Sequence, residues 1–303
     1  MKDLRDFEER FGTEKQCLDY LYSLRWPDGY RCPRCYHNEA WQIKEWKYKC
    51  RKCGYQATVT AGTLFQDSHL PIALWFKAIW YVCSQTGGAN ALDLQKQLNI
   101  GSYRTAWTML LKIRRLMADN EPVKLGGKVA VDNVGIYKNY RKACSNVFIA
   151  AELCSNRTVA NICMEKHEDF ADFLCTHIRA GSIIISSKSV DFWDDIPKSY
   201  KFRKVESIQL AQRQLMPITH DIIQWFDKQG MLDNQQLRSS SKHLQSYLTE
   251  CCYKFNRRNS TAGEMFDDLL YSAVHTDPLT NKQITTQKQL HQEIICGVTS
   301  KFK

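Results

Sequence analysis

The sequence predicts a multidomain α+β protein, and three observations lead to this fold class. Four cysteines near the N-terminus form two close pairs, Cys32 with Cys35 and Cys50 with Cys53, around a stretch of alternating strand-like residues. Helical periodicity follows over residues 68–120, and strand patterns are frequent after residue 126. A chain of 303 residues is long enough for two or three such domains.

Residues 1–26 are predicted to be helical. Their apolar residues recur at a rough helical spacing, and the segment ends at a turn formed by Pro27, Asp28 and Gly29. We therefore expect an N-terminal helical segment that stops just before the first cysteine pair.

Residues 27–60 are predicted to form a zinc ribbon. Two Cys-x2-Cys pairs separated by a hairpin-length segment allow four thiolates to surround one zinc ion: Cys32, Cys35, Cys50 and Cys53. The run from Trp41 to Lys49 alternates as a β-structure does. So small a domain takes its folding free energy from the metal, and four thiolates leave no position open for chemistry, so the zinc is structural.

The ribbon is also basic, with seven lysines and arginines against three acidic residues between positions 28 and 60. Aromatic residues are interleaved with these charges, a combination typical of contact with a phosphate backbone. Arg51 and Lys52 are our candidate DNA-binding residues here. The alternative is an ordinary solvated positive surface.

Residues 68–120 are predicted to form a helix-turn-helix domain. A short helix over 91–98 is followed by a turn at 99–101 and by a longer helix over 103–117, for which Ser102 is a suitable N-cap. Any helical hairpin shares this pattern, and that alternative stays open. The candidate DNA-binding residues of the longer helix are Tyr103, Arg104, Thr105, Thr108 and Lys112.

Residues 126–275 are predicted to form an RNase H-like α/β domain. Strands are expected over 128–132, 147–153, 158–163, 182–186 and 201–205, with helices over 168–179 and 219–226. This order of strands and helices matches that fold. The first strand would end at Asp132, whose carboxylate alternatively caps a turn. Residues 276–303 are interpreted as a polar tail.

Composition limits the compartment and the partners. The formal net charge of +10 is in the direction expected of a nucleic-acid binder. Of thirteen cysteines, nine lie outside the ribbon without a disulfide-like spacing, and the charged N-terminus lacks a signal-peptide core. No apolar run approaches the length of a membrane span. These features predict a cytoplasmic protein without membrane contact.

Several longer phrases resemble one family, the zinc-ribbon insertion-sequence transposases of the DDE class, which are relatives of the eukaryotic Merlin elements. The phrases span nearly the whole chain: LRWPDGYRCPRC at 24–35, TVTAGTLF at 58–65, KHLQSYL at 242–248 and FNRR at 255–258. The last phrase contributes Arg257 and Arg258 as further candidate DNA-binding residues.

The resemblance implies DNA strand cleavage and transfer by two divalent ions, Mg²⁺ or Mn²⁺, held between acidic residues. The first family aspartate corresponds to Asp132. Lys188 occupies the second acidic position, and Asp191 lies three residues beyond it. The family histidine of the third region corresponds to His220, which alternatively has only a structural role at a helix start, and Asp221 supplies a carboxylate only in a shifted register.

The sequence therefore predicts a transposase-family protein that binds the terminal repeats of an insertion sequence as double-stranded DNA, with an eroded catalytic site. If catalysis survives, Asp132, Asp191 and Asp221 are the candidate catalytic residues. The alternative is a non-catalytic, transposase-derived regulator or repressor, and a third interpretation is a ribbon that contacts protein or RNA. The family also implies a homo-oligomer on DNA.

Overall fold

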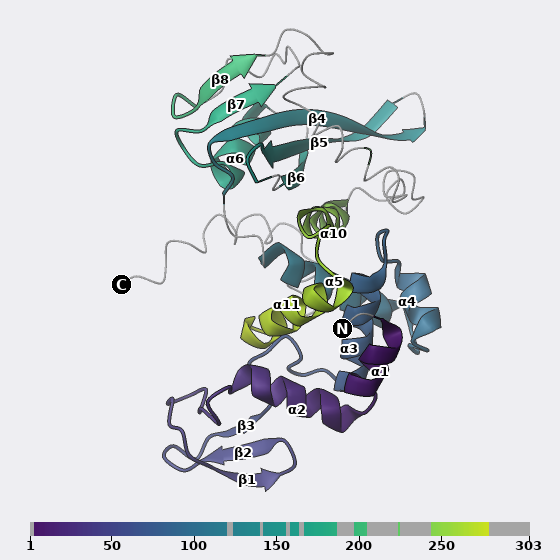
Figure 1. The fold of residues 1–303 in the computed structure, drawn as a ribbon, viewed down its shortest axis with the longest axis vertical. Helices are drawn as coiled ribbons and strands as arrows, with labels where there is room; N and C mark the ends of the chain where they lie inside the picture. The colour runs from purple at the N-terminus through teal and green to yellow at the C-terminus, as the bar shows by residue number, and fades with distance from the viewer. Residues whose placement is uncertain are drawn as a thin grey trace. The chain divides into compact units, whose positions relative to one another are not determined.

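The computed structural model describes residues 3–119, 124–139, 142–155, 158–163, 167–186, 197–204, 224 and 244–278. They form two compact units (Figure 1). The N-terminal unit contains residues 3–119 together with 259–278, and the C-terminal unit contains the described residues between 124 and 258. The mixture of helices and sheets confirms the predicted mixed α/β composition.

The N-terminal segment forms two helices, α1 (Leu4–Phe11) and α2 (Glu14–Arg25). The break between them is set by Thr13, whose side chain accepts from the backbone N–H of Gln16 while the Gln16 side chain accepts from the N–H of Thr13. This reciprocal capping box begins α2 sharply. The predicted helical segment is thus confirmed, with an interruption that the helical period alone did not indicate.

The ribbon strands are β1 (Ala40–Lys44), β2 (Lys47–Cys50) and β3 (Gln56–Thr58), which form an antiparallel sheet in that order. The β-structure predicted over residues 41–49 is the β1–β2 hairpin, in which Trp41 pairs with Lys49. The hairpin brings the two cysteine pairs to the same end of the ribbon.

Three further helices follow: α3 (Ile72–Ser84), α4 (Ala91–Gln97) and α5 (Tyr103–Asp119). Helices α4 and α5 agree closely with the helices predicted over 91–98 and 103–117. Helix α3 is apolar and largely buried, because its residues pack against other helices of the unit on several sides.

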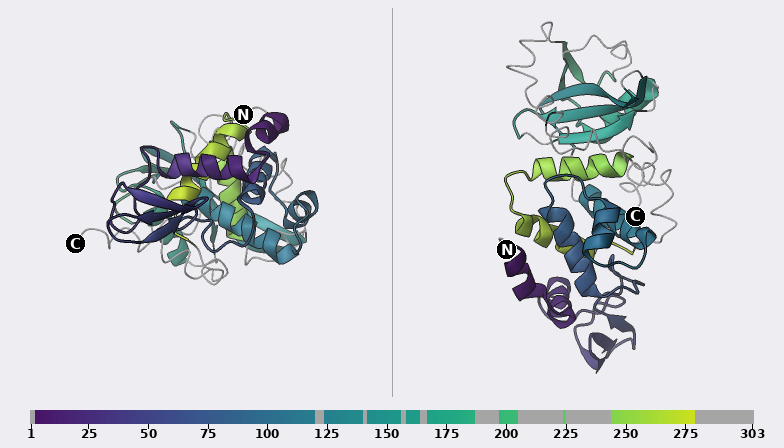
Figure 2. Two further views of the ribbon diagram at one scale, coloured as in Figure 1. Left: turned by 90° about the horizontal axis from the view of Figure 1, so that it is seen from below. Right: turned by 90° about the vertical axis from the view of Figure 1, so that its right-hand side faces the viewer.

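Helix α11 (Ala262–His275) completes the core of the N-terminal unit, although it lies far away in sequence (Figure 2). Phe266 contacts the rings of Phe7, Phe11, Phe76 and Trp80, with centroids 5.4–6.0 Å away. The sequence predicts one domain over residues 126–275, but α11 packs on α2, α3 and α5 and belongs with the N-terminal helices. Burial of its apolar face requires those helices.

The C-terminal unit is built on a five-stranded sheet with the order β6-β5-β4-β7-β8. The strands β4, β5 and β6 are antiparallel neighbours, whereas β7 and β8 run parallel to β4. Their bounds are β4 (Lys128–Asn139), β5 (Lys142–Glu152), β6 (Thr158–Cys163), β7 (Ile183–Ser186) and β8 (Lys201–Lys204).

Helix α6 (His167–His177) connects β6 to β7 and covers one face of the sheet. Phe170 and Phe173 of the helix pack against Phe148 of β5 in a core that includes Val129 and Val131 of β4. Because strand side chains alternate, Ala130 belongs to the opposite face, where it meets Ile185. Helix α10 (Leu244–Asn256) packs against β6.

Strand β4 is longer than predicted. It continues to Asn139, and Asp132 pairs with Ile149 in the middle of the β4–β5 hairpin. The prediction that Asp132 ends the strand is therefore wrong, because antiparallel pairing with β5 carries the strand seven residues further. The helix expected over 219–226 and the tail from 279 onward lie outside the described residues, apart from the helical residue 224.

Candidate metal centre and nucleic-acid interface

The four cysteines lie on two turns of the same construction. In the first turn the N–H of Tyr36 donates to the carbonyl of Cys32 at 2.9 Å, and in the second the N–H of Gly54 donates to the carbonyl of Cys50 at 3.0 Å. Both donors have a left-handed backbone, with φ of +59° at Tyr36 and +69° at Gly54. Glycine suits this conformation and tyrosine does not, so the first turn contains a strained residue.

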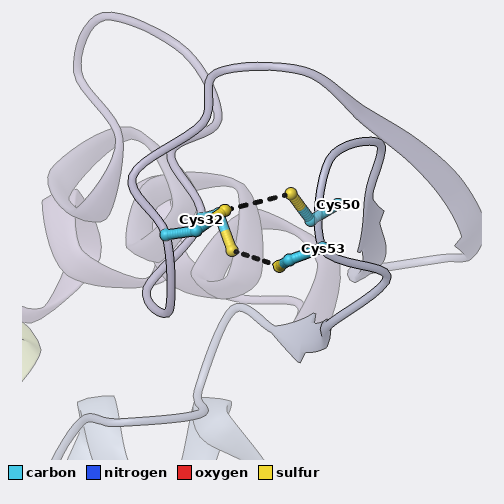
Figure 3. A group of neighbouring side chains, drawn as sticks. Cys32, Cys50 and Cys53 are labelled. Carbon is cyan, nitrogen blue, oxygen red and sulfur yellow. Dashed lines mark hydrogen bonds between the residues drawn. The ribbon is translucent and has the colours of Figure 1, made fainter.

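The four sulfurs converge between the two turns (Figure 3). The Sγ atoms of Cys32 and Cys53 are 3.7 Å apart, those of Cys35 and Cys50 are 3.6 Å apart, and all four lie within 4.8 Å of one another. Thiolates bound to zinc at about 2.3 Å in a tetrahedron are about 3.8 Å apart. The cysteine cluster therefore fits a closed structural zinc site, as predicted.

Backbone donors in the first turn favour ionised sulfur at Cys32. Burial by itself would raise the pKa of Cys32, but backbone N–H groups of Cys35 and Arg34, with help from neighbouring thiols, lower it to about 6. A thiolate is the form that binds zinc, and the N–H donors spread the negative charge of the site. The neighbouring thiols, in contrast, raise the pKa of Cys35 to about 12, so the lowered pKa is confined to Cys32 within this pair.

Arg25 fixes the ribbon to helix α2. Its guanidinium donates to the carbonyls of Thr58, the last residue of β3, and Val59 at 3.0 and 2.6 Å, and lies over the ring of Trp26. Burial lowers the pKa of Arg25 to about 10. A cluster of aromatic rings fills the same junction: Tyr22, Trp26, Tyr30 and Tyr48.

The outer surface of the ribbon combines positive charge with exposed aromatic area. Arg51 and Lys52 are both exposed, and the Arg51 guanidinium lies 5.6 Å from the ring centre of Trp41. Arg51 also forms an exposed ion pair with Glu39 at 3.3 Å. Trp41, which is 51% exposed on the outer strand β1, offers a flat surface beside these charges.

The α4–α5 hairpin has the local geometry that the sequence indicated. Asn90 caps α4, Asn99 takes a left-handed φ of +49° in the turn, and the Ser102 hydroxyl accepts from the N–H of Thr105 at the start of α5. Tyr103, 46% exposed, and Arg104 lie on the surface at this end of the helix.

The other predicted contact residues of α5, Thr105, Thr108 and Lys112, are less available for contact with DNA than Tyr103 and Arg104. The hydroxyl of Thr108 donates to the carbonyl of Arg104, and that of Thr105 pairs with Ser102, so both are already engaged within the helix end. Lys112 is only 8% exposed, lies over the ring of Trp75, and has its pKa lowered by burial. Its ammonium belongs to the interior of the helical unit, so it is not part of the exposed surface.

Arg257 and Arg258 follow α10. The Arg257 guanidinium lies 3.9 Å from the ring centre of Tyr253, and that of Arg258 lies 4.5 Å from that of Phe255, to whose carbonyl it also donates at 3.0 Å. Arg258 is exposed and Arg257 is half-buried.

Asp132 is the one candidate catalytic residue within the described residues, where it is half-buried on β4. The last β4 residue that pairs with β7 is Ala130, and Asp132 lies two residues beyond it on the same face of the sheet. Asp132 therefore stands at the carboxyl end of the parallel part of the sheet. Lys188, Asp191, His220 and Asp221 lie outside the described residues.

Two polar contacts that organise the N-terminal unit were not anticipated. The carboxylate of Glu14 accepts from the N–H groups of Ile72 and Ala73 at 2.8 and 2.7 Å, capping α3 in place of Pro71, which has no side-chain cap to offer. The Tyr20 hydroxyl donates to Asp267 of α11 at 2.9 Å. Neither partner could be chosen from sequence spacing, since they are 58 and 247 residues apart.

Comparisons with known proteins agree with this site. Residues 12–56 match the family model of a transposase zinc-ribbon domain of the IS1595 type. A protein of Halobacterium salinarum, described as an uncharacterized protein in transposable element ISH50, is 24% identical over 126 residues, which cover 40% of this chain and 42% of that relative. The chain thus matches less than half the length of this curated relative.

Together these matches show a transposase zinc-ribbon domain in residues 12–56 and support a zinc-ribbon insertion-sequence transposase. A cryo-EM structure of a simian T-cell lymphotropic virus intasome, in complex with PP2A regulatory subunit B56 gamma, matches 72% of each chain at 12% identity, but its TM-score of 0.26 is too low to bear on the fold. Of the helices in the described parts of the chain, none has the length and apolar character needed to cross a membrane.

Proposed function

We propose that this chain binds the ends of an insertion sequence as double-stranded DNA, using the ribbon and the start of α5. The observation that carries the proposal is the outer surface of the zinc ribbon, where Arg51 and Lys52 lie beside the exposed ring of Trp41. Cationic side chains on a metal-stabilised scaffold are suited to phosphates, and they provide affinity without sequence preference.

Sequence preference requires contact with base edges, and the exposed start of α5 is suited to that role. Tyr103 and Arg104 extend from the first turn of the second helix in a helix-turn-helix arrangement, the position that enters the major groove in proteins of that class. Arginine is the side chain that most often reads guanine there. Lys112 has no part in this proposal because it is buried.

We test this with duplexes taken from the DNA that flanks the gene. The double variant Arg51→Ala, Lys52→Ala should weaken binding to all duplexes alike and reduce the salt dependence of log K by roughly 2. Arg104→Ala should cost about 1–3 kcal/mol on the preferred duplex and less on others. Lys15→Ala, which removes an exposed charge from α2, is the matched control. Equal effects of all three changes would contradict the proposal.

We further propose that the C-terminal unit is an RNase H-like domain. The sheet order supports this, because three antiparallel strands are followed by an α6 crossover and two parallel strands. The position of Asp132 supports it as well, since ligand sites in α/β sheets lie at the carboxyl ends of parallel strands. Carboxylate oxygens there suit Mg²⁺ or Mn²⁺, and a metal pair needs at least two such residues.

The family resemblance favours an eroded catalytic site in this domain. Lys188 stands in the second acidic position that the family resemblance implies, and an ammonium group repels a divalent cation. We therefore propose DNA recognition without efficient strand cleavage, as in a transposase-derived regulator. An active transposase would need Asp191 or Asp221 to complete the site with Asp132.

A cleavage assay separates these two functions. The full chain is incubated with its preferred duplex and Mg²⁺ or Mn²⁺, beside Asp132→Asn and the control Asp93→Asn on α4. Specific binding without cleavage supports the regulator. Cleavage that is lost in Asp132→Asn and kept in Asp93→Asn identifies a working site, whereas cleavage that persists in Asp132→Asn removes Asp132 from the chemistry.

A further inference from the structure

Tyr30 presents a polar group that the fold leaves unsatisfied. Its side chain is 7% exposed and its hydroxyl is fully buried, yet this oxygen has no hydrogen-bond partner; within the described residues it is the one buried side-chain oxygen or nitrogen in that condition. Buried hydroxyl groups in native proteins nearly always have a partner. We therefore look for a ligand, or for another state of the protein, that supplies a hydrogen-bond partner for the Tyr30 hydroxyl.

The surroundings of the hydroxyl point to the sulfur cluster. Tyr30 precedes Cys32 by two residues, and its ring packs among those of Trp26 and Tyr48 at centroid distances of 5.0 and 5.6 Å. Burial and the adjacent Cys32 thiol raise the pKa of Tyr30, with smaller effects from Cys50 and Cys53. The buried phenol oxygen thus stands beside the cysteines, without a bond of ordinary geometry to any of them.

Zinc binding would make the cysteine sulfur a stronger hydrogen-bond acceptor for the Tyr30 hydroxyl. A neutral thiol is a weak hydrogen-bond acceptor, whereas a zinc-bound cysteine is a thiolate with negative charge on sulfur. Four thiolates on one Zn²⁺ leave a net charge of about −2, which hydrogen-bond donors around the sulfurs stabilise. The Cys32 sulfur already accepts from the backbone N–H groups of Arg34 and Cys35. The Tyr30 hydroxyl would be one further hydrogen-bond donor to the same sulfur.

We propose that the Tyr30 hydroxyl donates a hydrogen bond to the zinc-bound sulfur of Cys32 and so acts as a positioning residue of the metal site. Its buried hydroxyl is satisfied only when the ribbon holds its metal, which couples the aromatic junction between α2 and the ribbon to metal occupancy. This inference goes beyond DNA recognition and does not depend on it.

The test compares Tyr30→Phe with Tyr48→Phe in the full chain. Both variants remove one phenol oxygen from the same aromatic cluster, but the pKa of Tyr48 is raised by burial, Tyr22 and Asp19 and by no cysteine, so Tyr48→Phe is the matched control. Zinc affinity is measured by competition with a chromophoric chelator. The sulfur-to-metal charge-transfer bands are measured after replacement of zinc by Co²⁺.

We expect Tyr30→Phe to weaken zinc binding roughly 10-fold to 100-fold, the usual effect of removing an outer-shell partner. The charge-transfer bands should move to lower energy, because a sulfur that loses a hydrogen bond holds its lone pairs less tightly. Tyr48→Phe should change neither. The proposal is overturned if the two variants have the same spectrum and affinity, or if Tyr30→Phe binds zinc more tightly than the wild type. Circular dichroism in excess zinc verifies that both variants are folded.

Discussion

Replacing Arg25 by methionine should loosen the ribbon from helix α2. The change keeps a long, unbranched side chain against Trp26 but removes the donors to the carbonyls of Thr58 and Val59, at 3.0 and 2.6 Å. Thr58 ends β3 and Val59 follows it, so the contact joins the end of the ribbon sheet to the end of α2.

The magnitude follows from two opposing terms. A hydrogen bond from a charged donor contributes about 1.5–3 kcal/mol, so two such bonds would give roughly 3–6 kcal/mol. The guanidinium is desolvated, as its lowered pKa of about 10 indicates, and its removal recovers part of that amount. We therefore expect a net loss of about 2–3 kcal/mol, which corresponds to roughly 30-fold to 150-fold more opened ribbon.

Zinc transfer to an excess of chelator measures this opening, because the sulfurs are reached only when the ribbon detaches or unfolds. The control is Arg10→Met, which removes another arginine that lies over aromatic rings, those of Phe11 and Tyr20, but whose ion pair with Asp267 is exposed. Exposed pairs contribute about 0–1 kcal/mol, so transfer should accelerate less than about fivefold. Similar rates for both variants would refute the role assigned to Arg25.

The other predictions concern the caps, the turns and the polar contact to α11. Glu14→Ala should destabilise the N-terminal unit by about 1–2 kcal/mol in urea unfolding, because α3 loses its cap, and Glu14→Gln by less. Gly54→Ala should cost about 1–2 kcal/mol of zinc-ribbon stability because φ is +69° there, whereas Tyr36→Gly, at +59°, should change it by less than about 1 kcal/mol; a larger loss in Tyr36→Gly would contradict the strain argument. Burial and the bond to Asp267 raise the pKa of Tyr20 from 10.0 to about 12, so its stabilising contribution is complete below pH 10 and is lost as the pH rises toward 12. Urea midpoints of Tyr20→Phe should consequently fall less steeply than those of the wild type over that interval, and parallel curves would show that Tyr20 does not titrate this way.

The features that the sequence predicted well are those that depend on neighbouring residues. Two Cys-x2-Cys pairs specify their own turns, and the four sulfurs meet as the spacing required. The helices α3, α4 and α5 follow from local apolar periodicity and from caps such as Ser102. In each case the signal and the structure lie within the same few residues.

The features that were missed depend on partners far away in the chain. Lys112 was interpreted as a DNA contact because it is basic, but Trp75 of α3 lies beside its ammonium and the side chain is buried. The length of β4 comes from pairing with β5. One local signal was available for α11: Thr261 and Glu264 form a capping box before an apolar run, which marks a helix start.

The position of α11 has a consequence for how the protein is made. The ribosome completes the ribbon and helices α1 to α5 well before it reaches Ala262, so the aromatic core around Phe76 stays open during most of synthesis. A product truncated before Phe266 would keep every proposed DNA contact of the N-terminal unit but would lack helix α11. The rings of Phe7, Phe11 and Trp80 would then lose their contact with Phe266 and become more exposed to solvent. We therefore expect a fragment that ends before Phe266 to be less stable than the N-terminal unit of the full chain.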